Sequence, residues 1–364
     1  MCKRILKSET NNKGGIPFYK IGSFGKKTDV FIDKDKFELY KSKYPYPKKG
    51  DVLISAAGSI GKTVIFDGKD SYFQDSNIVW IDNDETKVLN PYLQYCYKNA
   101  KWKTTVGNTI VRLYNEGIRN TEIRVPSIPE QRKITFVLDK IQSAIDNKKQ
   151  QLALLDEAVK SEFVEMFGEP LVDNGKPFSE CISINPKKTE KKDWTSELEV
   201  SFIPMTSVGE HGEITTSETR IYDKVKSGFT YFSENDVLFA KITPCMENGK
   251  GAIAKDLKNF IGFGSTEFHV LRPIKNISNP YWIYYLTSFK EFRNFAEKKM
   301  TGSAGQKRVP VSAFNQILVN LPTMDLQNKF AAFVQQIDKS KFVVKQQIAD
   351  LQELLDSKMQ EYFS

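Results

Sequence analysis

Residues 133–163 read KITFVLDKIQSAIDNKKQQLALLDEAVKSEF, and residues 329–359 read KFAAFVQQIDKSKFVVKQQIADLQELLDSKM. In both stretches apolar residues recur at alternating steps of four and three, which is the spacing of a coiled-coil seam. Each seam contains one lysine, Lys148 or Lys341, and a polar residue there can fix the register of the pair. The apolar seam positions are Ile134, Leu138, Ile141, Ile145, Leu152, Leu155 and Val159 in the first stretch, and Phe330, Val334, Ile337, Val344, Ile348, Leu351 and Leu355 in the second.

The pattern predicts two long helices. A seam of about 33 residues extends roughly 50 Å at 1.5 Å per residue, which is more than one small domain needs to be covered. Each helix could still pack only on its own domain. We favour the alternative, in which the two helices pack together as an antiparallel coiled coil and hold two domains apart.

Each predicted helix follows one copy of a unit that occurs twice in the chain. The frame GDVLIS at 50–55 matches NDVLFA at 235–240, so the sequence predicts an α+β fold with two pseudo-repeated mixed α/β domains separated by the two helices. The expected boundaries are 1–127, 128–168, 169–322 and 323–364, in the order domain, helix, domain, helix. Asn90-Pro91-Tyr92 also matches Asn279-Pro280-Tyr281, and in both we predict that Asn is the N-cap and Pro the first helical residue. Pro126 and Gln131 match Pro322 and Gln327.

The stretch AAGSIGKT at 56–63 ends like a phosphate-binding P-loop. A P-loop needs a glycine five residues before Gly61, where this chain has Ala56, and it must lead into a helix. Here β-branched and apolar residues follow at 63–66, so we predict a strand, a loop and a second strand. We therefore regard a nucleotide-dependent enzyme as the least favoured function for this chain.

Two further loops, KTTVGNTIVR at 103–112 and KMTGSAGQKR at 299–308, occupy equivalent places in the two copies. Each combines a glycine turn with small hydroxyl or amide side chains and flanking cations. Small residues let a backbone approach DNA, cations neutralise phosphates, and Asn, Gln and Arg can read base edges. Ordinary polar surface turns have the same composition, so both interpretations stay open.

The net charge of +8 fits a polyanionic partner, with nucleic acid ahead of an anionic membrane, although a lysine-rich surface kept for solubility would look the same. Residues 1–50 contain 13 Lys and Arg against 5 Asp and Glu, which equals the whole surplus.

Groups that could carry chemistry are sparse. The 2 histidines and 4 widely spaced cysteines form no zinc pattern, no recognisable catalytic set is found, and no apolar run is long enough to cross a membrane. We expect no catalytic residue, metal or cofactor, no membrane association, and a cytoplasmic location in which the thiols stay reduced.

The duplicated order resembles the specificity subunits of type I restriction-modification enzymes. The resemblance is carried by GDVLISAAGSIGK and its partner NDVLFAKITPCMENGKGAIA, by TGSAGQKRV, and by VPSIPEQRKITFVLDKI leading into the first heptad helix. The entry into the second helix, LPTMDLQNKFAAFVQQID, is a looser version of the entry into the first. The resemblance covers nearly the whole chain. In one departure from the family's pattern, the first copy enters its first strand, Ile16-Pro17-Phe18, after only 15 residues, so we expect its N-terminus to be short.

The resemblance implies two target-recognition domains that each read one half of a bipartite DNA sequence, joined by helices that set the spacing. It implies a subunit without a catalytic site, whose partners are double-stranded DNA, DNA adenine methyltransferase subunits and a motor-nuclease subunit. The candidate DNA contacts are Gly58, Ser59, Gly61, Lys62, Thr105, Asn108, Thr109 and Arg112 in the first copy, and Lys241, Lys250, Gly302, Ser303, Gln306, Lys307 and Arg308 in the second. A coiled-coil scaffold that assembles a complex without reading bases is the alternative.

Overall fold

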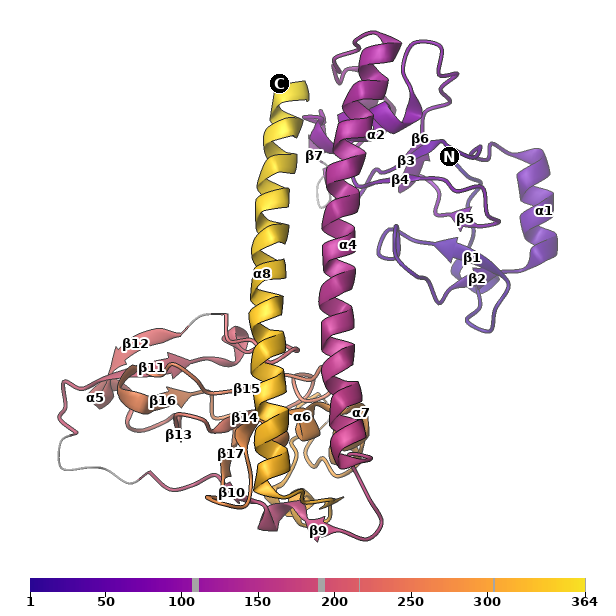
Figure 1. Ribbon diagram of the computed structural model, residues 1–364. Coiled ribbons are helices and arrows are strands. Elements are labelled where there is room, and N and C mark those ends of the chain that lie inside the picture. The colour runs from indigo at the N-terminus through magenta and orange to yellow at the C-terminus, as the bar shows by residue number, and fades with distance from the viewer. Residues whose placement is uncertain (107–110, 189–193, 216, 304, 364) are drawn as a thin grey trace. The chain divides into compact units, whose positions relative to one another are not determined.

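Figure 1 shows the protein as a computed structural model, which describes residues 1–106, 111–188, 194–215, 217–303 and 305–363. The chain forms two compact units. The first unit contains Met1–Lys149 and Gln346–Ser364, and the second contains Gln150–Lys345. Each unit therefore holds one mixed α/β domain together with part of each long helix.

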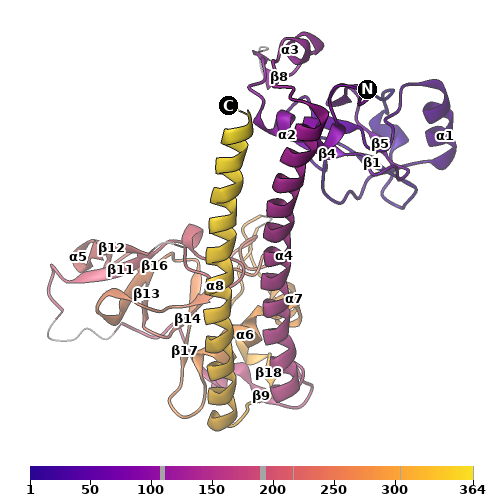
Figure 2. The ribbon, with the colours of Figure 1, turned by 45° about the horizontal axis from the view of Figure 1, so that its top comes forward.

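The first unit has two small three-stranded sheets. In one, β1 (Ile16–Tyr19) lies between β2 (Phe31–Ile32), which is antiparallel to it, and β5 (Tyr72–Phe73), which is parallel. In the other, β3 (Val52–Ser55) lies between β4 (Thr63–Ile65) and β6 (Ile78–Trp80), both antiparallel. The other elements are a 3-10 turn (Lys7–Glu9), α1 (Lys34–Lys43), α2 (Asn90–Asn99), a hairpin of β7 (Thr105–Val106) and β8 (Val111–Arg112), and α3 (Asn115–Arg119), with β8 and α3 visible beyond α2 in Figure 2.

The second unit repeats this topology and enlarges it. Its first sheet has the order β12 (Glu218–Ile221), β11 (Glu199–Ile203), β16 (Ile261–Gly264) and β13 (Thr230–Ser233), and again only the β11–β16 pair is parallel. Its second sheet has the order β10 (Ile182–Ile184), β17 (Phe268–Pro273), β14 (Val237–Ala240) and β15 (Gly251–Ile253). The other elements are β9 (Lys176–Pro177), α5 (Tyr222–Val225), α6 (Pro280–Ser288), α7 (Lys290–Lys298), β18 (Leu318–Val319) and 3-10 turns at Phe178–Glu180, Met205–Ser207, Lys258–Phe260 and Val311–Asn315.

The registers confirm the duplication read from the sequence. Leu53, in the central strand of its sheet, pairs with Val64 and Trp80, and Leu238, 185 positions later, pairs with Ala252 and Val270. The predicted strand, loop and strand over 50–66 is also confirmed, because β3 and β4 form an antiparallel pair across the loop.

An aspartate caps the turn that leads into the central strand of each copy. The Asp51 carboxylate accepts from the Lys48 amide at 2.8 Å, and Asp236 accepts from the Ser233 amide at 2.7 Å. The preceding residue has positive φ in both copies, +94° at Gly50 and +66° at Asn235, a conformation that glycine and asparagine tolerate best. The GD and ND pairs of the repeated frame are thus turn residues, and their role is structural.

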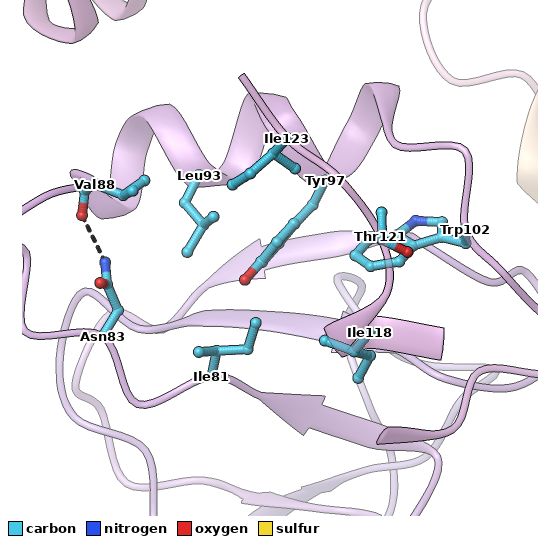
Figure 3. A pocket seen from close by; sticks show the side chains of 9 residues that line it. All are labelled: Ile81, Asn83, Val88, Leu93, Tyr97, Trp102, Ile118, Thr121 and Ile123. Atoms are coloured by element: carbon cyan, nitrogen blue, oxygen red, sulfur yellow. Dashed lines mark hydrogen bonds between the residues drawn. The ribbon is translucent and has the colours of Figure 1, made fainter. Parts of the chain in front are cut away.

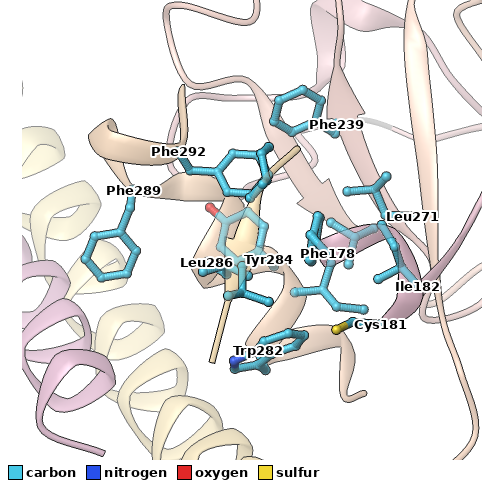
Figure 4. Packing of buried hydrophobic residues seen from close by; sticks show 14 of the residues in the cluster. Phe178, Cys181, Ile182, Phe239, Leu271, Trp282, Tyr284, Leu286, Phe289 and Phe292 are labelled. Atoms are coloured by element: carbon cyan, nitrogen blue, oxygen red, sulfur yellow. The ribbon is translucent and has the colours of Figure 1, made fainter. Parts of the chain in front are cut away.

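The largest apolar core lies in the second unit and joins its domain to the long helices. Trp282 on α6 is fully buried beside Phe178, and Phe292 on α7 packs edge-on against Phe178 at a ring separation of 5.4 Å (Figure 4). Phe163 contributes to the same core. In the first unit, Cys2 and Ile5 belong to the core, so the N-terminal residues pack on the first domain.

The two long helices, α4 (Ile128–Phe167) and α8 (Met324–Phe363), run antiparallel within each unit (Figure 1). In the first unit Leu138 clusters with Leu355, and in the second Phe163 packs edge-on against Phe330 at 5.5 Å. The fold class predicted from the heptads is therefore confirmed. Among the predicted seam positions, Ile134, Leu138, Ile141, Ile145, Val159, Phe330, Val334, Val344 and Leu355 are buried, and Leu152, Leu155, Ile337, Ile348 and Leu351 are half-buried.

The two seam lysines are half-buried. Lys341 forms an ion pair of 2.5 Å with Asp156 within the second unit, and its side chain is 14% exposed. The pair lets a charged residue occupy a seam position without an unpaired buried charge.

Two glutamines tie the long helices to the domains that precede them. Gln131 and Gln327 are both 0% exposed. The Gln131 side chain accepts from the Leu89 amide at 2.8 Å and donates to the carbonyls of Lys87 and Pro126. The Gln327 side chain accepts from the Asn279 amide at 2.8 Å and donates to the carbonyls of Ile277 and Pro322. The matched glutamines of the repeat thus make the same three hydrogen bonds.

The helix start that we predicted at the Asn-Pro pairs is correct in one copy only. Asn279 is the N-cap of α6, and its side chain accepts from the Tyr281 amide at 2.9 Å. In the first copy the N-cap is Leu89, and Asn90 is already helical. The prediction is wrong there by one residue because Glu85, which accepts from the Asn90 amide at 2.8 Å, supplies the capping carboxylate instead.

Candidate nucleic-acid interface

The loop between β3 and β4 is closed by its own hydrogen bonds. The Ser55 hydroxyl donates to the Ser59 carbonyl and accepts from the Lys62 amide, and the Gly61 amide donates to the Ser55 carbonyl. The Ile60 amide donates to the Gly58 carbonyl. A P-loop turns its amides toward a phosphate, whereas these three already have partners within the protein. The geometry thus agrees with the prediction that this loop does not hold a nucleotide.

A second segment of the first copy lies directly against this loop. Ala57 forms a β-bridge with Arg112, and the Leu113 amide donates to the Ala56 carbonyl at 2.9 Å. Gly61 has a φ of +83°, and a Cβ there would lie 2.5 Å from the Trp102 indole nitrogen. The two candidate loops of the first copy are therefore one surface, and glycine is required where they meet.

The second copy makes the same connection at the equivalent residues. Ile242 forms a β-bridge with Arg308, and the Val309 amide donates to the Lys241 carbonyl at 2.9 Å. Ile242 is the repeat partner of Ala57 at offset 185, and Arg308 is the partner of Arg112 at offset 196. In each copy the same backbone bridge therefore brings the two candidate loops together. We call the pair of loops in each domain its tip.

The first tip presents few unengaged cations. Lys62 donates its ammonium to the Phe24 carbonyl, which fixes its position, and no carboxylate among the described residues forms an ion pair with it. Gly58 and Ser59 are exposed, and Arg112 is half-buried in strand β8. Thr105 is placed in β7, whereas Asn108 and Thr109 lie outside the described residues.

The second tip has more charge, and part of it is already paired. The Arg308 guanidinium makes two hydrogen bonds to Glu267, at 2.8 and 2.9 Å, and so holds the pKa of that carboxyl below its ordinary value. Lys250 donates to the Met205 carbonyl at 3.3 Å, and Lys241 is half-buried. The exposed members of the predicted set are Gly302, Ser303, Gln306 and Lys307.

A hollow lies between the two loops of the second tip and the C-terminal end of α7. Its volume is about 640 Å³, and it combines cations with carboxylates. Glu247 accepts from the Thr243 hydroxyl at 2.7 Å through one oxygen, and the other is buried without a hydrogen-bond partner among the described residues. The lining residues are Thr243, Glu247, Asn294, Glu297, Lys298, Met300, Gly305 and Lys307.

One hollow of the first unit, beside α2, has a different character. Its volume is about 210 Å³, and Figure 3 shows Tyr97 reaching from α2 toward Ile81 across it. Its lining contains no charged side chain, so it offers nothing to pair with a phosphate or a metal. The lining residues are Ile81, Asn83, Val88, Leu93, Tyr97, Trp102, Ile118, Thr121 and Ile123.

The prediction from sequence missed Glu247 in the second tip and Arg293 on α7, which contacts that tip. Arg293 is 5% exposed, and burial lowers its pKa to about 10, so the guanidinium remains charged at neutral pH. A signal for it was present, because Phe292, Arg293 and Ala296 share the apolar face of α7. An arginine on such a face indicates that polar acceptors are buried opposite it.

The described residues contain no group of three His, Cys, Asp or Glu side chains that could hold a metal ion. No helix among them has the length and apolar character that a membrane span requires.

The chain belongs to a family of DNA-specificity proteins. The family model described as the type I restriction modification DNA specificity domain matches residues 1–157 and again residues 178–353, so both copies of the repeat carry the domain. The family that the sequence resembles is therefore confirmed.

Relatives with curated names belong to the same class. A Haemophilus influenzae protein provisionally named as a type I restriction enzyme specificity subunit is 54% identical over 173 residues, which is 48% of this chain and 45% of that protein. The EcoEI specificity subunit of Escherichia coli is 41% identical over 149 residues, or 40% of this chain and 24% of that protein. The matches thus span less than half of these relatives. The names describe specificity subunits and not methyltransferase or nuclease subunits.

Solved structures share the fold. The S subunit of a type I restriction-modification system from M. genitalium aligns with a TM-score of 0.50 at 15% identity, covering 100% of this chain and 92% of that one. A chain from a structural study of complex assembly in the type I R-M system aligns with a TM-score of 0.53 at 13% identity, covering 95% and 90%. At these identities the likeness concerns the fold alone.

Proposed function

We propose that this chain is the specificity subunit of a type I restriction-modification complex, without a catalytic site of its own. Each domain reads one half of a bipartite duplex sequence, and the subunit directs adenine methylation and restriction by its partner subunits. In this proposal residues 1–127 and 169–322 are the target-recognition domains, and residues 128–168 and 323–364 are the spacer helices.

One observation carries the proposal. Both tips are built on the same β-bridge, yet their loops differ in side chains, and the loop after the central strand is longer in the second copy (241–250) than in the first (56–62). A shared frame with unlike tips is what two readers of different DNA half-sites require, because phosphate contacts position a protein while base contacts specify the sequence. A scaffold protein would have no need for divergent, cation-bearing loops on a common frame.

Salt-dependent binding to duplex DNA tests the proposal. The chain is mixed with the DNA adenine methyltransferase subunit of its own system, and affinity is measured by fluorescence anisotropy at several salt concentrations. We expect log K to fall steeply with log salt, with a slope of about −0.9 for each phosphate neutralised. Binding that is absent, or that does not respond to salt, contradicts the proposal.

A pair of lysine substitutions separates DNA reading from a scaffold role. Lys241→Ala with Lys307→Ala removes two cations from the second tip without breaking the Arg308–Glu267 pair. We expect the salt slope to become shallower by about 2, while binding of the methyltransferase subunit is retained. The control carries Lys224→Ala and Lys275→Ala, two exposed lysines of the same unit outside the tip. An equal change in both double variants, or in neither, argues for a scaffold.

A further inference from the structure

The buried Arg293 holds one half of the long loop in the second tip. Its guanidinium donates to the Met246 carbonyl at 2.9 Å, to the Gly249 carbonyl at 3.2 Å and to the Lys250 carbonyl at 3.3 Å. Its Nε donates to the Thr287 carbonyl at 2.6 Å, at the end of α6. One planar side chain thus connects the loop to the helical layer beneath it.

The guanidinium has no ion-pair partner in the part of the chain that the structure describes, and its four acceptors are backbone carbonyls. It also lies over the Phe239 ring, 4.4 Å from the centroid. A buried charge is retained only where its hydrogen-bonding groups are satisfied. The loop carbonyls therefore satisfy Arg293, and Arg293 in turn fixes the loop, because the fork of N–H groups is rigid.

The first tip closes its loop in another way. There the Ser55 hydroxyl spans the loop, from the Ser59 carbonyl to the Lys62 amide. The repeat partner of Ser55 is Ala240, which has no hydroxyl, and the loop that follows it runs from 241 to 250 before β15 begins. The longer loop lacks this hydroxyl bridge. Its own backbone bonds, such as the Lys250 amide to the Cys245 carbonyl at 3.0 Å, are supplemented by Arg293, which holds it from α7.

We propose that Arg293 is the positioning residue for sequence reading by the second tip, and that Ser55 has the same role in the first. This inference rests on the proposed function. Discrimination between bases depends on donors and acceptors held in place, and a good contact to a base pair is worth roughly 5- to 150-fold in selectivity. A loop that moves would lose that selectivity while its lysines still attract phosphate.

Selection of bound sequences from a randomised duplex library tests the assignment. The chain is used in complex with its methyltransferase subunits, as wild type and as Arg293→Met, Arg293→Lys and Ser55→Ala. Lys290→Met, an exposed position on α7, is the control. Unfolding temperature and the salt slope of binding are measured for each complex.

We expect Arg293→Met to reduce selectivity about tenfold or more at the bases of one half-site only. Ser55→Ala relaxes the other half-site, and neither variant changes the salt slope. Arg293→Lys relaxes the same half as Arg293→Met, because a lysine has the charge but not the fork. The Lys290→Met control selects the wild-type motif.

The inference is overturned if Arg293→Met leaves both half-sites intact or relaxes both equally, or if Arg293→Lys keeps full selectivity. It is also overturned if Ser55→Ala and Arg293→Met relax the same half. Should Arg293→Met not fold, Arg293→Lys decides alone. A wild-type complex that selects no motif at all refutes the proposed function itself, which is a different result.

Discussion

Replacing Gln327 with methionine removes three hydrogen bonds while it preserves the length and volume of the side chain. Each of these bonds contributes about 1 kcal/mol net, so their loss costs about 3 kcal/mol. The Asn279 amide and the carbonyls of Ile277 and Pro322 are then left without this partner, and an unsatisfied buried group costs a further ~1–3 kcal/mol. Relief by water or small shifts offsets part of this, and we expect a total of about 3–5 kcal/mol.

Amide hydrogen exchange measured by mass spectrometry localises the effect. In Gln327→Met, exchange should accelerate roughly 100-fold or more in the peptide that contains the Asn279 amide, because about 3 kcal/mol corresponds to two decades in an opening equilibrium. In Gln131→Met the same acceleration should appear at the Leu89 amide instead. Each variant thus serves as the control for the other, since the two glutamines belong to different units.

Gln336→Met is the matched surface control, because this residue is exposed on the same helix as Gln327. Its effect should stay within about 0.5 kcal/mol. A loss smaller than 1 kcal/mol in Gln327→Met would refute the claim that the side-chain amide joins the helix to its domain. So would equal acceleration at both amides in either variant.

Three further predictions concern stability. Burial lowers the pKa of His269, so the folded state stays neutral while the unfolded state takes up a proton below the ordinary pKa of 6.5. Stability should therefore fall as the pH is lowered from 7.5 to 5.5. In thermal melts His269→Gln should flatten that dependence, and an unchanged slope would contradict the assignment. Gly61→Ala should cost about 1–3 kcal/mol in urea unfolding of the first unit, because its Cβ would meet Trp102 and its φ is positive. An unchanged midpoint would contradict the close approach of Gly61 to Trp102. Leu138→Ala should cost about 2–5 kcal/mol by the same assay, since this seam residue is fully buried in a cluster with α8, and a loss below 1 kcal/mol would contradict that packing.

The long helices were predictable because their pattern is local and periodic. The strand pair at 50–66 was predictable for the same reason, because β-branched residues follow the loop where a P-loop would require a helix. The error at Asn90 has a different origin. The capping carboxylate of Glu85 lies outside the Asn-Pro-Tyr match, so the aligned triplets could not reveal that the helix starts one residue earlier.

The residues of the tips were proposed from composition, which gave no indication of the residues that contact them. The Arg308–Glu267 pair joins positions 41 residues apart, and Lys62 reaches a carbonyl 38 residues away. Arg293 contacts a loop 43 to 47 residues earlier in the chain. Such contacts depend on how strands and helices are layered, and spacing along the chain carries no information about them.

The methylated motif in DNA tests the central claim most directly. The chain is expressed with its adenine methyltransferase subunits in a host that lacks other adenine methylation, and modified positions are mapped by long-read sequencing. The account predicts one bipartite motif, with two specified parts separated by a stretch of fixed length and free sequence. A single continuous motif, or methylation that is the same without this chain, would contradict it.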